Sequence, residues 1–172
     1  MRNDRRTGTD LARSPVLTAS VQRHTGIRAG ALLLACVLAA DTLLASSAVE
    51  FHHALDNAPL EIKPRPDETI TGAVEKFLAT GENPYHGDTA ALEAGKRLYQ
   101  RNCQACHLPD GSGRLGPSLI DHDVINARAG TDVGDFEILY GGARGAMQSF
   151  ARRGMSLDDM LKTIAYVRSL KK

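Results

Sequence analysis

Five consecutive residues, Cys103-Gln104-Ala105-Cys106-His107, have the types and the spacing that attach a c-type haem. Two thiols separated by two residues can each add to one haem vinyl group and form a thioether. The histidine that follows the second cysteine is placed to reach the iron as its proximal axial ligand. The pattern therefore predicts one covalently bound haem c, held by Cys103 and Cys106 and ligated by His107.

Two other kinds of site also use paired cysteines. A C-x-x-C pair can form a disulfide redox centre, or it can supply half of a zinc site. A zinc site needs a second pair of ligands, and the third cysteine of the sequence, Cys36, falls in a segment that we expect to be removed. A thioredoxin-like site needs a surrounding βαβ pattern, which this sequence lacks. The haem interpretation is therefore preferred.

The iron of such a haem needs either an open face or a second ligand from the chain. The candidates after the motif are Met147, Met155, Met160 and His122. Met160 falls on the apolar face of the last expected helix, and Met155 is placed to pack against it as a hydrophobic staple. Met147 instead follows a glycine-rich turn, where the backbone can approach a flat cofactor. We therefore predict Met147 as the distal ligand, which favours Fe(II) and raises the reduction potential.

The glycine-rich segment after the motif, residues 108–119, is expected to fold around the proximal side; a mobile loop is the plainer alternative. The segment contains turn residues, but it lacks the Lys-Ser/Thr pair and the following helix of a phosphate-binding loop. Pro117 in this segment has a carbonyl but no N–H. A carbonyl near the Nδ1–H of His107 would fix the tautomer and the orientation of that ring.

Helices are the elements expected to position these residues. A first helix runs from a cap at Asp67 or Thr69 to about Thr80, because apolar residues recur on one face. A second helix begins at Asp88 or Thr89 and runs into the haem motif. That face of the first helix comprises Ile70, Val74, Phe77 and Leu78.

Two further helices are expected after the motif. One begins at Thr131 or Asp132 and ends at Gly141, and residues 121–130 before it are expected to hold a short helical turn. The last helix begins after the cap Ser156. Its apolar stripe comprises Leu157, Met160, Leu161, Ile164 and Val167.

Gly95 and Tyr99 share one stripe of the second helix. A glycine there allows another helix to cross closely, and the aromatic ring four residues on can pack beside the crossing. The plainer alternative is an amphipathic helix that tolerates a glycine at a cost of about 1 kcal/mol. No strand pattern competes with the helices, so the sequence predicts an all-α fold.

Residues 1–48 have the features of a secretory signal peptide. They carry six arginines against three aspartates, and an apolar run at residues 30–40 precedes small residues that fit a cleavage site after Ala48. The run is too short for a transmembrane helix of about 20 residues, and Asp41 interrupts it. An uncleaved anchor is the alternative. We therefore expect export to the periplasm, which agrees with haem attachment outside the bacterial cytoplasm.

Residues 49–66 contain three prolines and are expected to form an extended arm without regular structure. His52 and His53 in this arm are interpreted as solvated surface side chains rather than as metal or haem ligands.

Aromatic residues make up 5% of the chain, and tryptophan is absent, so side chains alone would fill a core poorly. A buried haem would supply a large apolar body in their place. Residues 49–172 hold 15 basic and 17 acidic residues. This balance argues against a nucleic-acid-binding protein, which needs a clustered basic face.

Residues 88–172 resemble the class I cytochromes c, whose helices wrap around one covalently bound haem. The resemblance rests on Gly95 and Tyr99, the Cys103-x-x-Cys106-His107 motif, Gly116-Pro117-x-Leu119, Met147-x-x-Phe150 and Tyr166 in the last helix.

A longer stretch, roughly residues 51–172, resembles the cytochrome cL family. The matching segments are Phe-Leu-x-Thr-Gly-x-Asn-Pro-Tyr at residues 77–85, Gly-Gly-Ala-x-Gly-x-Met at residues 141–147, and residues 156–161. The resemblance implies three parts: a signal peptide at 1–48, an N-terminal extension with one short helix at 49–87, and a cytochrome c domain at 88–172.

The resemblance also implies function. Cytochrome cL is the soluble electron acceptor of periplasmic PQQ-dependent methanol dehydrogenases, and it passes electrons to another cytochrome c or an oxidase. It is not an enzyme, and neither nucleic-acid binding nor stable membrane insertion is expected. The family can hold Ca²⁺ near a haem propionate, but no ligands are assigned here. The haem-binding residues carried over are Cys103, Cys106, His107 (proximal), Met147 (distal) and Pro117 (the carbonyl behind the proximal ligand).

Some members of the family have a competing histidine three positions after the distal methionine, where this chain has Phe150. Two alternative functions remain. One is a general class I cytochrome c that serves a different dehydrogenase. The other is a haem enzyme or a gas sensor with an open distal site.

Overall fold

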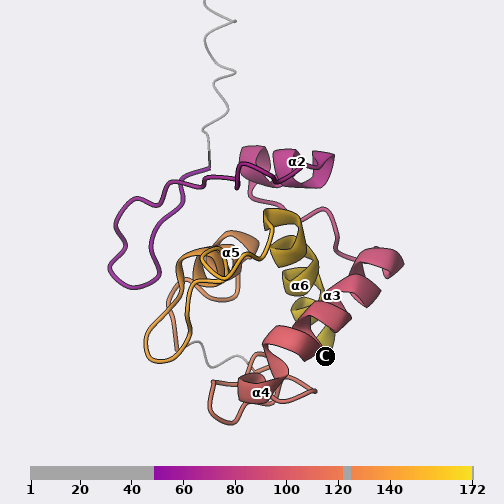
Figure 1. Cartoon of the computed structure of the whole chain (residues 1–172). Helices are drawn as coiled ribbons and strands as arrows, with labels where there is room; N and C mark the ends of the chain where they lie inside the picture. Colours follow the sequence, from indigo (N-terminus) through magenta and orange to yellow (C-terminus); the bar gives the residue numbers. More distant parts are fainter. Residues whose placement is uncertain (1–48, 122–124, 172) are drawn as a thin grey trace, which may run out of the picture. The chain divides into compact units, whose positions relative to one another are not determined.

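Helices are the only extended regular elements in the part of the chain that the structure describes, residues 49–121 and 125–171 of a computed structural model. None of these helices is long and apolar enough to cross a membrane. The prediction of an all-α fold is confirmed. The predicted signal peptide and His122 lie outside the described residues. The helices are α2 (Gly72–Thr80), α3 (Thr89–Asn102), α4 (Gln104–His107), α5 (Asp132–Gly141) and α6 (Leu157–Leu170) (Figure 1).

Three of the helices begin at caps that the sequence predicts. Asp88, Thr131 and Ser156 each accept a hydrogen bond from the backbone N–H three residues further along the chain. Each bond satisfies one of the N–H groups that the first turn of a helix leaves without a partner. The starts of α3, which precedes the haem motif, and of α5, which follows it, are thereby fixed.

The predicted start of the first helix is wrong. Neither Asp67 nor Thr69 caps it; α2 begins after Thr71, whose hydroxyl accepts the N–H of Val74. The preceding residues are held elsewhere, because the Glu68 carboxylate accepts the backbone N–H of Leu157 at 2.5 Å. This contact joins segments 89 residues apart in the sequence, so local pattern could not reveal it.

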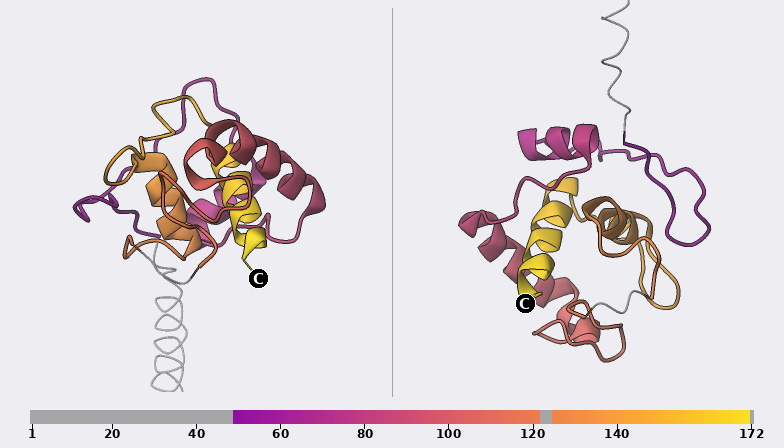
Figure 2. Two further views of the ribbon diagram at one scale, coloured as in Figure 1. Left: turned by 90° about the horizontal axis from the view of Figure 1, so that it is seen from below. Right: turned by 180° about the vertical axis from the view of Figure 1, so that it is seen from behind.

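α3 and α6 cross, as Figures 1 and 2 show, and Gly95 lies at the contact between them. A methyl group on Gly95 would lie 2.1 Å from the carbonyl oxygen of Lys162 and 2.9 Å from Cβ of Tyr166. The ring centroids of Tyr99 and Tyr166 lie 5.5 Å apart beside the crossing. The predicted close helix crossing is confirmed, and the glycine is required by backbone contact.

The apolar core lies between α2, α5 and α6 and uses all four phenylalanines of the chain. The Phe77 and Phe136 rings are 4.8 Å apart between centroids, and Phe51 lies 5.8 and 5.7 Å from them. Phe150 joins the same cluster. The four phenylalanines are therefore concentrated in one place, and the haem motif lies outside it. The buried core residues are Val74, Phe77, Phe136, Leu139, Phe150, Leu157, Met160, Leu161 and Ile164.

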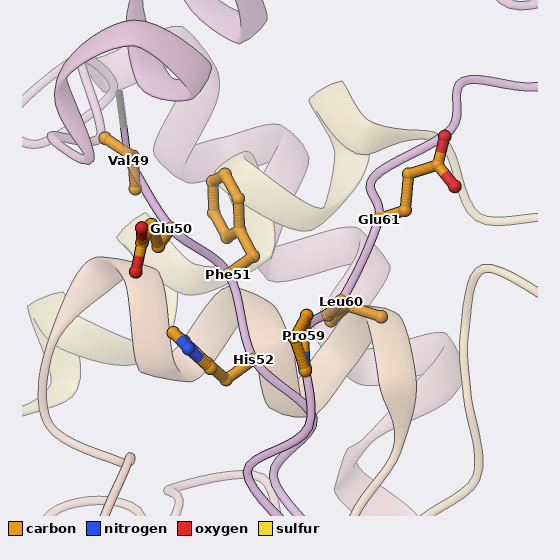
Figure 3. Close-up of a pocket in the computed structure, with 7 residues that line it drawn as sticks. All are labelled: Val49, Glu50, Phe51, His52, Pro59, Leu60 and Glu61. Carbon is orange, nitrogen blue, oxygen red and sulfur yellow. The ribbon is translucent and has the colours of Figure 1, made fainter. Parts of the chain in front are cut away.

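The N-terminal arm, residues 49–66, folds back on itself rather than running fully extended. An isolated antiparallel bridge joins His52 and Pro59, and Leu60 donates its N–H to the Phe51 carbonyl at 2.8 Å. The two segments of this turn line a surface recess of about 390 Å³, shown in Figure 3. The recess is formed by the arm and has no haem-motif residue in its lining.

A buried ion pair fastens this arm to α5. Glu137 is fully buried, accepts the backbone N–H of His52 at 2.7 Å and pairs with Arg128 through both carboxylate oxygens. Arg128 also donates to the Asn57 side chain at 3.0 Å. His52 and His53 are half-buried, so they are less solvated than the sequence suggests. Residues 125–130 form turns here, with Ala129 donating its N–H to the Asn126 carbonyl at 2.9 Å, within the stretch 121–130 where a short helical turn is expected.

Candidate haem site

The haem motif begins where α3 ends, and its last four residues form the short helix α4. Cys103 ends one helix and starts the other, and its carbonyl accepts the N–H groups of Cys106 and His107. The helical turn sets the spacing between the two cysteines. Both are free thiols; Cys103 is buried and Cys106 is half-buried.

The state of Cys103 argues against a redox thiol. Burial raises the pKa of this thiol to about 11, and the nearby charge of Arg153 lowers it only in part. A thiol-exchange centre needs a thiolate, which an elevated pKa opposes. The raised pKa of Cys103 therefore argues against disulfide exchange at this pair.

The glycine-rich loop folds back onto the end of α4. Gly113 donates to the carbonyl of His107 at 3.0 Å, and Gly116 donates to that of Cys106 at 3.0 Å. The Tyr99 hydroxyl donates to the Leu108 carbonyl at 2.6 Å and ties α3 to the start of this loop. These bonds satisfy carbonyls that a helix end leaves open, and they bring Pro117 beside the motif.

His107 is held in one orientation. Its side chain is buried, and its Nδ1 lies 2.8 Å from the Pro117 carbonyl oxygen. A carbonyl can only accept, so Nδ1 carries the proton and Nε2 keeps its lone pair. Gly116 packs against the ring: a methyl group there would lie 2.5 Å from Cε1 and 2.9 Å from Nε2. Sequence reasoning identified Pro117 but missed Gly116, for which the Gly-Pro pair is the available signal.

Met147 lies in the loop that follows α5, residues 142–155, hereafter the distal loop. Its carbonyl accepts the Ala143 N–H at 2.9 Å, and Phe150 donates its N–H to Leu139 at 2.9 Å. These bonds fix the loop against the end of α5. Met147 is half-buried and packs against the apolar core.

The other two methionines have structural roles. Met160 is fully buried in the core, and Met155 is half-buried and packs against that core. Neither needs a ligand to explain its position. Met147 thus stays the candidate for a distal ligand among the described methionines after the motif.

The two candidate ligands belong to different parts of the protein. Met147 packs on the core, whereas the residues of the haem motif are not members of the core cluster. Among the described helices, α4 contacts α3 alone. The haem motif is thus attached to the rest of the described helices mainly through α3. The buried His107 with a free Nε2, the two free thiols and the soft sulfur of Met147 fit a c-type haem placed between them.

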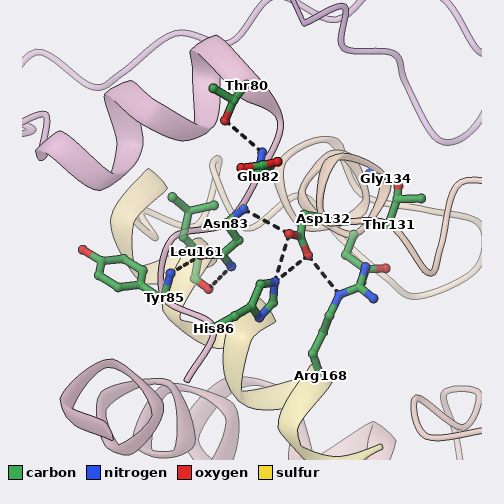
Figure 4. Close-up of polar contacts among 11 residues, drawn as sticks. Thr80, Glu82, Asn83, Tyr85, His86, Thr131, Asp132, Gly134, Leu161 and Arg168 are labelled. Carbon is green, nitrogen blue, oxygen red and sulfur yellow. Dashed lines mark hydrogen bonds and ion pairs between the residues drawn. The ribbon is translucent and has the colours of Figure 1, made fainter. Parts of the chain in front are cut away.

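The described residues give no support to a calcium site. No group of three or more His, Cys, Asp or Glu side chains that could hold a metal is found among them. Asp132, on α5, is already satisfied: it binds His86 Nε2 at 2.9 Å, the Asn83 N–H at 3.0 Å and Arg168 at 3.0 Å (Figure 4). Arg168 also pairs with Asp135 at 3.3 Å, so a cation would have to displace an existing positive charge.

A family model described as cytochrome C oxidase, cbb3-type, subunit III matches residues 90–167. Cytochrome c-L of Methylorubrum extorquens is 42% identical over 100 residues, which cover 58% of this chain and 50% of that protein. Subunit CcoP of the cbb3-type cytochrome c oxidase of Rubrivivax gelatinosus is 32% identical over 96 residues, 55% of this chain and 31% of that one. The matched part thus spans half the length, or less, of these two relatives.

Two solved structures are similar over more of their length. Cytochrome cL from Methylophaga aminisulfidivorans is 35% identical with a TM-score of 0.68, and the match covers 72% of this chain and 81% of that one. Cytochrome cL from Hyphomicrobium denitrificans is 32% identical with a TM-score of 0.68, covering 73% and 76%. The chain therefore belongs to the cytochrome cL family, and it is a c-type cytochrome with a class I fold that carries electrons rather than an enzyme.

Proposed function

We propose that this cytochrome binds one haem c through Cys103 and Cys106, with His107 and Met147 as the axial ligands. When bound, the haem supplies a one-electron couple between Fe(III) and Fe(II). The observation that carries this proposal is the geometry of His107, whose ring is buried and whose Nδ1 is hydrogen-bonded to Pro117, so that Nε2 is left as the ligating atom.

Each residue has a separate part in this assignment. The cysteines keep the cofactor from dissociating, and the Pro117 carbonyl holds the imidazole in the ligating tautomer. The Met147 thioether favours the reduced metal and closes the site to other ligands. A closed site suits electron transfer and argues against a haem enzyme or a gas sensor.

Absorption spectroscopy tests the distal ligand. The oxidised protein is expected to show the weak red band of methionine bound to Fe(III), and Met147→Ala is expected to lose it. Met155→Ala is the matched control, because it truncates a methionine that packs against the core. Loss of the band in the Met155 variant instead would overturn the assignment.

We further propose that the electron donor is a periplasmic PQQ-dependent methanol, or other alcohol, dehydrogenase. The support is the similarity to cytochrome cL structures over about three quarters of the chain, which includes more than the haem domain alone. The electron would pass next to another cytochrome c or to an oxidase. Docking should be brief, with an interface near or below about 1,200 Å².

Stopped-flow reduction by a purified methanol dehydrogenase tests the donor. We expect reduction much faster than that of an unrelated class I cytochrome c at equal concentration and ionic strength. Equal rates for the two cytochromes would remove the donor assignment and leave the haem assignment intact.

The second candidate function is a general carrier that serves a different dehydrogenase. The match of the haem region to a cbb3-type oxidase subunit favours a role close to a terminal oxidase. Rapid electron transfer to a purified cbb3 oxidase, combined with no reaction with methanol dehydrogenase, would favour this candidate.

A further inference from the structure

A short segment before α2 contacts the protein at both ends of the distal loop. Residues 63–68, hereafter the strap, lead from the end of the N-terminal arm towards α2. The strap meets the chain just before the loop at Tyr140, which is the penultimate residue of α5. It meets the other end of the loop at Gly154 and, just beyond the loop, at Leu157. Both ends of the loop are therefore fastened to one segment.

Tyr140 fastens the start of the loop through its side chain and its backbone. Its hydroxyl accepts the backbone N–H of Lys63 at 2.9 Å and donates to the Lys63 carbonyl at 3.2 Å. The Tyr140 carbonyl accepts the Ser149 hydroxyl at 2.5 Å, and that hydroxyl oxygen accepts the Arg152 N–H at 3.2 Å. Ser149 stands two residues after Met147, so Tyr140 joins the strap to the middle of the loop.

Glu68 and Arg65 fasten the end of the loop. One carboxylate oxygen of Glu68 accepts the backbone N–H of Leu157 at 2.5 Å, and the other accepts that of Arg65 at 3.2 Å. The Arg65 guanidinium donates to the Gly154 carbonyl. Leu157 is the first residue of α6, and its N–H has no partner within that helix. The strap therefore fixes both the last turn of the loop and the helix that follows it.

Between these fastenings the loop has little burial of its own around Met147. Residues 144–146 and Gln148 are exposed, and Met147 itself is half-buried. The nearest buried side chain of the loop belongs to Phe150, three positions later. A segment with few buried apolar contacts opens locally at a low cost in free energy. The position of Met147 therefore depends on bonds that are made at the ends of the loop.

We propose that the strap positions the distal ligand: through Tyr140 and Glu68 it keeps the distal loop closed, so that the Met147 sulfur stays on the iron. The inference rests on the proposed axial ligation by His107 and Met147. A foreign ligand reaches the distal face only when the loop is open, so its apparent affinity is proportional to the fraction of open molecules. The strap lowers that fraction. Tyr140 and Glu68 act through the loop and are therefore positioning residues.

A cap on α6 would be a purely structural role for the strap, and two observations argue against it. Ser156 already caps this helix, because its hydroxyl accepts the Asp159 N–H at 3.1 Å. The contact with Tyr140 lies on α5, at the opposite end of the loop. The two roles also predict different effects: loss of a cap weakens the whole fold, whereas loss of the strap opens the loop.

Imidazole binding to the oxidised holo-protein tests the proposal, with loss of the red band reporting the replacement of Met147. Tyr140→Phe removes the hydroxyl and keeps the ring, which stacks on Phe136 at 5.8 Å between centroids. Glu68→Ala removes the acceptor of the Leu157 N–H. Each variant should bind imidazole on the order of tenfold more tightly than wild type, because a lost hydrogen bond shifts the loop towards its open form.

Three further variants make the test specific. Tyr85→Phe is the matched control, since it removes a hydroxyl that donates to Asp158 at 2.5 Å and not to the strap or the loop. Thr71→Ala removes the cap of α2 and should lower the unfolding temperature. Both should bind imidazole as wild type does. Glu68→Gln keeps one acceptor oxygen and should restore part of the wild-type behaviour.

Hydrogen–deuterium exchange, followed by mass spectrometry, locates the opening. With imidazole on the iron, Met147 no longer holds the loop, so exchange there reports the strap alone. Peptides that cover residues 142–155 should exchange faster in Tyr140→Phe and Glu68→Ala than in wild type, whereas peptides of α3 should exchange at the same rate. Equal acceleration in α3 would mean general destabilisation and would overturn the inference.

The outcomes separate this inference from the proposed ligand. If Met147→Ala loses the red band but neither Tyr140→Phe nor Glu68→Ala changes the imidazole affinity, the ligand assignment stands and the role of the strap is refuted. The role is also refuted if Tyr85→Phe tightens imidazole binding as much as Tyr140→Phe does. A red band that persists in Met147→Ala removes the ligand assignment, and the inference falls with it.

Discussion

His107 shows how much of the site depends on its neighbours in the loop. The ring is oriented by one hydrogen bond, to the Pro117 carbonyl, and by one surface, the Cα of Gly116. Neither neighbour would bind the metal. Both nevertheless decide where Nε2 points, so they are positioning residues for the proposed proximal ligand.

Gly116→Ala tests this positioning. The new methyl group would lie within 3 Å of three atoms of the His107 ring, so the ring or the loop has to move. We expect a changed reduction potential and a weakened red band, together with a lower unfolding temperature. Leu115→Ala is the control: that side chain is 79% exposed in the same loop, and its truncation should leave the spectrum unchanged. An unaltered potential in the Gly116 variant would contradict the role.

Asp158 is a second residue whose surroundings determine its behaviour. Its carboxylate accepts hydrogen bonds from the hydroxyls of Thr71 at 2.8 Å and Tyr85 at 2.5 Å, and it pairs with Lys162. Burial acts to raise the pKa of Asp158, but Lys162, Tyr85 and Thr71 together outweigh it and hold this pKa below the ordinary value.

A lowered pKa in the folded protein makes the contribution of Asp158 dependent on pH. The charged form is favoured by folding, so its stabilisation is complete above the ordinary carboxyl pKa of about 4 and is lost as the pH falls through the lower folded value. We expect Asp158→Asn to lower the urea midpoint clearly at about pH 7 and much less near pH 2–3. Glu93→Gln, at an exposed position of α3, is the control. A gap between wild type and Asp158→Asn that does not change with pH would refute this account.

At the scale of elements, the crossing of α3 and α6 is the main contact between long helices. Gly95 is in contact with the backbone of Lys162, so the two helix axes approach more closely than side chains permit. Gly95→Ala would force the helices apart and should lower the free energy of unfolding by about 1–3 kcal/mol, since overpacking is not relieved by a flexible neighbour. Urea unfolding of the holo-protein measures this.

Gly72→Ala provides the matched control for that prediction. Gly72 is the first residue of α2, and a methyl group added to it would have no neighbouring atom within 4 Å. Alanine favours helix over glycine, so this variant should be neutral or more stable by up to about 1 kcal/mol. Equal destabilisation by both variants would mean that helix crossing is not the cause.

Elements whose ends depend on neighbours in the sequence could be predicted. The caps Asp88, Thr131 and Ser156 each bond a residue three positions away. The close helix crossing at Gly95 could be predicted from its spacing to Tyr99. The start of α2 could not be predicted, because Glu68 is engaged by a helix 89 residues away. The same holds for the candidate site. The thiols and His107 could be predicted because they stand in one motif, whereas the contact of Gly116 with the His107 ring depends on the folded loop. The roles of Pro117 and Met147 remain predictions.

At the scale of the whole described region, one buried ion pair ties the N-terminal arm to α5, in addition to the packing of Phe51 on the core. Glu137 and Arg128 join α5 to the turn at residues 125–130 and, through His52 and Asn57, to the arm. Glu137 has no exposed surface, so its carboxylate oxygens rely on these partners rather than on water for hydrogen bonds. Neither the charge pattern nor the helical periodicity of the sequence marks this pair, because its members are joined only by the fold.

Glu137→Ala should therefore release the arm. Removal of one partner leaves a poorly compensated guanidinium and an unsatisfied N–H, and we expect a loss of about 3 kcal/mol in the free energy of unfolding. Limited proteolysis should cut within residues 49–60 more rapidly than in wild type. Glu137→Gln, which keeps an acceptor oxygen, should cost less. Glu61→Ala, at an exposed ion pair with Lys63, should leave the cleavage rate unchanged. Protection of the arm in Glu137→Ala would show that the apolar contacts of Phe51 suffice.

The α3–α6 crossing also affects the order in which the chain can fold. Residues 95 and 162 meet only after a loop of about 67 residues closes, at an entropic cost of roughly 4 kcal/mol. Among the described helices, α3 has no other long partner. Until residue 162 is available, α3 therefore has no long helix to pack against. For that interval the two cysteines that follow α3 lie on an unanchored segment, and Cys103 does not yet have the burial that it has in the folded protein.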